Sequence, residues 1–227
     1  MDLFTRRTWR PALVAAGLLT AAGGSMHPDA DGSLPMREEL AIMTADPAWV
    51  PGHTLVAVGT VLVTVVLVSL LRAGAWGPSV RLPLLVAGVA MAAYSVETVL
   101  HLAAVVDSHA LAHGHAAPVA DTHVGLAVVL YPVSGLAVAW LSVALVRTWR
   151  GPRRLVALPG MAGGLVHAVS LLVTFALPTA ETSPVFAAAG MLMSLWALLL
   201  GLGAPSLDRT VTRSPAAEVS RDLQPAV

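Results

Sequence analysis

The chain has 227 residues, of which 56% are hydrophobic and only 11% are charged, and its mean hydropathy is +0.77. In a soluble domain about a quarter of the residues are charged, so this composition excludes an ordinary soluble protein. It indicates a polytopic membrane protein whose partner is the lipid bilayer. The formal net charge is zero, which offers no basic surface to a nucleic acid, and the absence of cysteine excludes disulfides, thiolate ligands, iron–sulfur clusters and covalently attached haem.

Six apolar segments follow one another along the chain. Backbone N–H and C=O groups in lipid must be satisfied within the segment, so we predict an all-α bundle of six transmembrane helices. The spans cover residues 9–26, 50–71, 82–106, 123–146, 155–177 and 184–204. We expect residues 1–204 to form a single transmembrane domain, and the polar residues 205–227 to form a disordered cytoplasmic tail.

The first of these segments allows a second interpretation. The stretch TRRTWR, followed by a short apolar run and small residues, is also typical of a secretory signal. Cleavage near Ala22 would leave five spans. The orientation of the other five spans is the same in both cases.

Arginine placement predicts that orientation. With the N-terminus inside, twelve of the thirteen arginines fall on the cytoplasmic side and only Arg37 falls outside, as the positive-inside rule requires. Lysine is absent and Ala, Val and Gly are abundant, which favours a bacterial origin. We therefore predict a multi-pass protein of a bacterial cytoplasmic membrane with both termini in the cytoplasm.

Two outer connections carry most of the remaining polar residues. In the first, the stretch PMREELAIM has helical spacing and is expected to lie on the outer membrane surface or to cap the bundle. The second, residues 107–122, reads as a loop that exposes His109, His113 and His115 to solvent.

Most histidines lie near the predicted outer face, and one acid lies beneath them in the membrane. Seven of the eight histidines lie there, and only His167 lies deep in a span. Glu97 is the one acid well inside the membrane, where an ionised carboxylate costs several kcal/mol unless it is paired, hydrated or protonated. Glu97 and His101 are four residues apart and therefore share one face of a helix.

This pattern suggests a metal site. Imidazole and carboxylate groups are the ligands of zinc and similar divalent ions, and a helix can present two of them four residues apart. We predict an outward-facing site centred on Glu97 and His101, completed by His53, His123 and His167, that binds a transition-metal ion for handling or transport.

Other interpretations remain open. A single b-type haem could use axial histidines from His53, His101 and His123, and Glu97 with His167 could relay protons in transport or sensing. Glu97 and a histidine could also form a structural pair in an accessory subunit without a ligand, and histidines at helix ends such as His27 often serve as interfacial polar residues.

No nucleophile elbow or phosphate-binding loop is present in the sequence, so we expect a binding protein rather than an enzyme. Hydrolysis of a lipid at a zinc site is the enzymatic alternative. The sequence does not indicate an oligomeric state.

Overall fold

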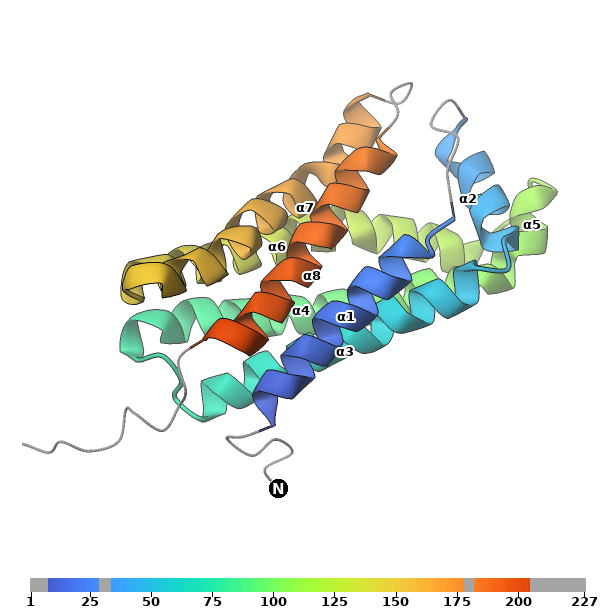
Figure 1. Cartoon of the computed structure of the whole chain (residues 1–227). Coiled ribbons are helices and arrows are strands. Elements are labelled where there is room, and N and C mark those ends of the chain that lie inside the picture. Colours follow the sequence, from blue (N-terminus) through green and yellow to red (C-terminus); the bar gives the residue numbers. More distant parts are fainter. Residues whose placement is uncertain (1–7, 29–33, 178–181, 205–227) are drawn as a thin grey trace, which may run out of the picture.

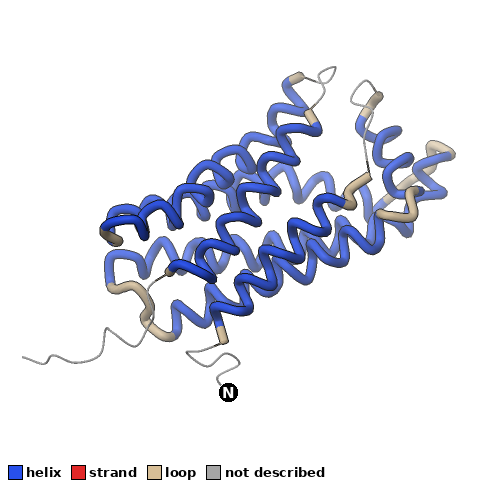
Figure 2. Tube along the Cα trace, in the orientation of Figure 1, coloured by secondary structure: helices blue, strands red, loops and turns tan. Residues whose placement is uncertain are grey.

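The computed structural model describes residues 8–28, 34–177 and 182–204, and these residues form a helical bundle without strands (Figures 1 and 2). The sequence prediction of an all-α bundle is therefore confirmed. The α-helices are α1 (Trp9–Ser25), α2 (Met36–Ala45), α3 (Trp49–Arg72), α4 (Pro78–Ala103), α5 (Ser108–Ala112), α6 (Pro118–Thr148), α7 (Leu158–Ala176) and α8 (Ser183–Gly203), and two 3-10 helices are η1 (Ala104–Asp107) and η2 (Gly151–Ala157). The predicted cytoplasmic tail, residues 205–227, lies outside the described residues.

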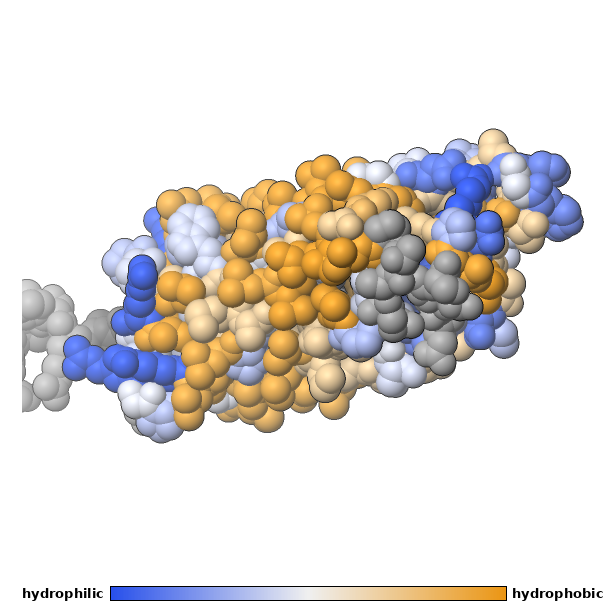
Figure 3. Space-filling model, turned by 90° about the horizontal axis from the view of Figure 1, so that it is seen from above, coloured by the Kyte–Doolittle hydropathy of each residue, from blue (hydrophilic) through white to orange (hydrophobic). Residues whose placement is uncertain are grey.

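Among the described residues, five helical runs are long and apolar enough to cross a membrane: α3, α4 with η1 and α5, α6, η2 with α7, and α8. Seen from above, the molecule carries an apolar band across its middle and hydrophilic residues at both ends (Figure 3). This is the distribution expected of a multi-pass membrane protein, whose lipid-facing surface is apolar. The first predicted span, α1, has 17 residues, fewer than the other five.

The helix α1 nevertheless belongs to the bundle. It packs against α3 on one side and α8 on the other, and the other long helices pack in the pairs α3–α4, α4–α6, α6–α7 and α7–α8. These six helices therefore form a closed ring in which each is antiparallel to its two neighbours (Figure 1). Small residues permit the close packing: a Cβ on Gly135 of α6 would come within 2.4 Å of the Gly164 carbonyl oxygen of α7.

The two ends of the bundle differ in character. One end, here called the arginine end, carries the α3–α4 and α6–α7 connections with Arg72, Arg81, Arg147 and Arg150. Under it lies an aromatic cluster, in which the Trp76 ring meets those of Trp9 and Trp149 edge-on at 6.1 and 5.6 Å. The other end, here called the capped end, carries α2 and α5, which pack against each other (Figure 1).

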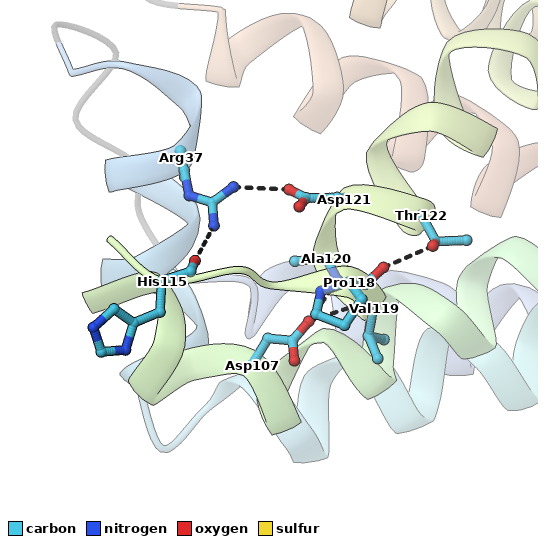
Figure 4. A network of polar contacts seen from close by, with 8 residues as sticks. All are labelled: Arg37, Asp107, His115, Pro118, Val119, Ala120, Asp121 and Thr122. Atoms are coloured by element: carbon cyan, nitrogen blue, oxygen red, sulfur yellow. Dashed lines mark hydrogen bonds and ion pairs between the residues drawn. The ribbon is translucent and has the colours of Figure 1, made fainter. Parts of the chain in front are cut away.

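The predicted helix in the first connection is confirmed, and it caps the bundle. Leu40 of α2 is buried together with Trp49, Leu111 and Ala117 in a small apolar cluster. The guanidinium of Arg37 donates to the Asp121 carboxylate of α6 at 2.9 Å and to the His115 carbonyl oxygen (Figure 4). The helix α2 is therefore attached to the start of α6 by both an apolar and a polar contact.

The second connection is not the open loop that the sequence suggested. The chain continues from α4 through η1 into α5, and α6 begins at Pro118 instead of at His123. Asp107 explains the early start, because its carboxylate accepts hydrogen bonds from the Val119 and Ala120 amides at 2.7 and 3.0 Å (Figure 4). These amides are unsatisfied at a helix N-terminus, so the side chain of Asp107 caps α6 from a distance. His109, His113 and His115 are exposed, as predicted.

Candidate metal centre

Four segments bring histidines to one place beneath the cap. His27 lies two residues after the end of α1, and His53 lies near the start of α3. Glu97 and His101 lie four residues apart toward the end of α4, and His123 lies near the start of α6. Because α1, α3, α4 and α6 are consecutive members of the ring, these helix ends meet at the capped end.

His27, His53 and His101 form the first group, here called the outer triad. Their possible ligand atoms all lie within 4.8 Å of one another. The ring centroids of His27 and His53 are 4.9 Å apart, and those of His53 and His101 are 4.4 Å apart. His27 is exposed, His101 is partly exposed and His53 is buried, so this group can be reached from the surface.

Hydrogen bonds fix the tautomers of two of these rings. The Nδ1 of His53 lies 2.8 Å from the Trp49 carbonyl oxygen, and the Nδ1 of His27 lies 2.9 Å from the Pro28 carbonyl oxygen. A carbonyl only accepts, so in each neutral ring the proton is on Nδ1 and the lone pair is on Nε2. Backbone carbonyls orient metal-binding histidines in this way. The buried Nε2 of His53 has no hydrogen-bond partner among the described residues, which leaves it available to a cation.

The Trp49 ring packs against two imidazoles of the outer triad. It is fully buried, and its ring lies 3.9 Å from that of His53 and 5.0 Å from that of His101, centroid to centroid. Its indole N–H donates to the Leu102 carbonyl oxygen at 3.2 Å. The ring therefore packs against two imidazoles while its polar atom is tied to α4, which restricts their movement.

A close helix contact places His27 in this group. A Cβ on Gly23 of α1 would lie 2.5 Å from the Gly52 carbonyl oxygen of α3, so only glycine permits the observed approach. Gly23 is four residues before His27, and Gly52 is next to His53. The approach of the two backbones thus brings the two imidazoles together.

Glu97, His101 and His123 form the second group, here called the inner triad. Their ligand atoms also lie within 4.8 Å of one another. Glu97 is 0% exposed, and its Oε1 lies 2.7 Å from Nδ1 of His123. The His123 ring stacks on that of His101, with centroids 4.0 Å apart and planes at 20°.

The inner triad is poorly satisfied by protein groups alone. Among the described residues, the one short polar contact of the Glu97 carboxylate is the 2.7 Å contact of Oε1 with Nδ1 of His123, and its Oε2 has no hydrogen-bond partner. A buried carboxylate with so few partners is costly, and a cation beside it offsets that cost. The group therefore has the composition and the electrostatic need of a cation site.

His167 lies elsewhere. It is in neither triad, and its ring stacks on that of Tyr131 at 4.6 Å and meets that of Tyr94 at 5.0 Å. The histidine that contacts Glu97 is His123, and not His167, its suggested partner in a proton relay. His167 Nε2 has no hydrogen-bond partner among the described residues, so this histidine is a buried polar group in an aromatic setting.

The structure thus brings together Glu97, His101, His53 and His123, four of the five residues predicted for the site, and adds His27. Sequence reasoning treated His27 as an interfacial residue at a helix end. Its position at the outer end of the first segment was the available signal, but the adjacency of α1 and α3 was needed to use it.

Comparison with known proteins adds no relative: the chain matches no protein-family model, no curated protein and no solved structure.

Proposed function

We propose that this chain is an integral membrane protein that binds a divalent transition-metal ion beneath its capped end, for metal handling or transport. The observation that carries the proposal is the convergence of four imidazoles and one fully buried carboxylate from four segments. Two of the imidazoles have Nδ1 engaged by backbone carbonyls and are thereby oriented to bind through Nε2.

The donor set indicates the class of ion. Imidazole nitrogens suit zinc, copper(II), nickel and cobalt(II), whereas calcium and magnesium prefer sites made of oxygen ligands. The chain has no cysteine, so thiolate-dependent ions such as copper(I) are less suited. Ligation requires neutral imidazole, so we expect acid that protonates the ligands to release the ion.

Packing favours a small ion over haem. A bis-histidine haem needs a planar slot between its two axial imidazoles. The His101 ring instead lies directly against the rings of His53 and His123, at 4.4 and 4.0 Å. Rings in such direct contact leave no space between them for an iron and its porphyrin, which axial imidazoles approach edge-on through a nitrogen atom.

The test is metal content and binding in the purified protein. We expect the parent in detergent, dialysed against Co²⁺ or Zn²⁺ at neutral pH, to retain one ion per chain by elemental analysis. His101→Ala removes a ligand from both triads and should lose the ion, whereas Glu38→Gln, an exposed carboxylate of α2 at the same end, should keep it.

Two results would contradict the proposal. One is a parent that retains no ion while His101→Ala and His101→Gln melt at the parent's temperature. The other is a strong Soret band in the parent, which would instead assign the histidines to haem.

A further inference from the structure

The two triads differ in exposure and in charge, although they share His101. The outer triad consists of imidazoles alone and includes the exposed His27. The inner triad contains Glu97, which is 0% exposed, and His123, which is 6% exposed. A cation thus meets neutral ligands near the surface and a carboxylate in the interior.

We propose that the two triads are successive positions for a single ion, which passes from the outer to the inner triad by exchanging ligands around His101. This inference rests on the proposed function, because it concerns the path of the same ion. No bond other than metal–ligand bonds changes: the ion leaves His27 and His53 and gains Glu97 and His123, while its oxidation state stays the same.

Electrostatics favours one ion at a time. Two divalent ions in both triads would bring four positive charges into a small volume, and the only acid in either triad is Glu97. Because the two triads share His101 and the inner one is buried, such repulsion is weakly screened. Sharing His101 adds a second reason, because one imidazole binds two ions only after it loses both ring protons.

Electrostatics also favours movement of the ion from the outer triad to the inner triad. The outer imidazoles coordinate the ion without offsetting its charge, which suits capture from water. The carboxylate of Glu97 offsets one positive charge in a dry environment, where the attraction is stronger than at the surface. His27 lies beyond the last residue of α1, so its ring can release the ion without disturbing a helix.

The experiment uses Co²⁺, whose visible absorption reports its ligands, with the parent and two variants of the full chain. The parent should bind one Co²⁺ and release it slowly to EDTA. His27→Ala should give the parent's spectrum and stoichiometry but load at least ~10-fold more slowly, because only the inner triad is intact. Glu97→Gln should bind one Co²⁺ with an altered spectrum and release it at least ~10-fold faster, because the ion stays in the outer triad.

Three outcomes separate this inference from the proposed function. Two ions per parent chain at saturation would overturn sequential occupancy and retain metal binding. Loss of the ion in both variants, each with the parent's helix content by circular dichroism, would show one site with mixed ligands and overturn this inference alone. A parent that binds no Co²⁺, Zn²⁺, Ni²⁺ or Cu²⁺ would overturn both.

Discussion

At the scale of the residue, position separates two kinds of histidine at the capped end. His53 is buried, and its Nδ1 is held by the Trp49 carbonyl, so its Nε2 has a fixed direction. His113 makes a similar bond to the His109 carbonyl, at 2.8 Å, yet both rings are exposed. An exposed imidazole is hydrated and pays no cost for an unused lone pair, whereas a buried one does.

We therefore expect the exposed histidines to be dispensable for both folding and metal binding. Replacing His109, His113 and His115 together by Gln should change the free energy of unfolding by less than ~0.5 kcal/mol, as is usual for surface substitutions. Affinity for Co²⁺ should stay within about twofold of the parent, because none of the three belongs to either triad. Thermal unfolding in detergent and Co²⁺ titration measure both quantities; loss of the bound ion would mean that these exposed histidines bind the metal.

At the scale of the element, the site depends on how closely α1 approaches α3. Gly23 contacts the α3 backbone, whereas a Cβ on its neighbour Gly24 would meet no atom within 4 Å. The two glycines are in the same turn of the same helix, so they form a matched pair for substitution.

We expect Gly23→Ala to force the two helices apart and to lower the free energy of unfolding by about 1–3 kcal/mol, as overpacking does. The displaced α1 should also move His27 away, so that Co²⁺ loads as slowly as in His27→Ala. Gly24→Ala should be neutral or slightly stabilising, because alanine favours a helix. Equal melting temperatures and loading rates for the two variants would show that this contact does not position the site.

At the scale of the whole molecule, the bundle has a long axis with an arginine end and a capped end (Figures 1 and 3). Of the arginines that the structure describes, Arg37 alone lies at the capped end. The positive-inside rule then predicts that the candidate metal centre opens away from the cytoplasm. A site with this orientation would take ions from outside the cell.

The chain has no cysteine, so a single introduced cysteine can be labelled without background to test the orientation in the membrane. Ala112 is exposed at the capped end and Ala73 is exposed in the α3–α4 connection at the arginine end. In intact bacterial cells, a membrane-impermeant maleimide should label Ala112→Cys, and should label Ala73→Cys only after the membrane is permeabilised. The reverse pattern would place the metal centre on the cytoplasmic side and reverse the proposed direction of uptake.

Much of the fold could be predicted because the bilayer imposes simple rules. Apolar runs of about twenty residues identified the five long helices, and the spacing of Met36, Leu40 and Met43 identified α2. The boundaries were less accurate where polar residues decide them. The carboxylate of Asp107 starts α6 at Pro118, ahead of the apolar run, and that distant capping bond leaves no local pattern in the sequence.

Residue types and their order are enough to show that this chain is a helical membrane protein, that its histidines collect toward one end, and that Glu97 needs a partner. These conclusions follow from the cost of burying polar groups in lipid, which depends only on residue type and depth. Helix packing is needed to show which groups meet: His123 with Glu97, His27 with His53, and His167 with two tyrosines. Hydrophobicity sets the depth of a helix but not its neighbours. Those are chosen by close contacts such as that of Gly23 with Gly52 and by closure of the ring through α1 and α8.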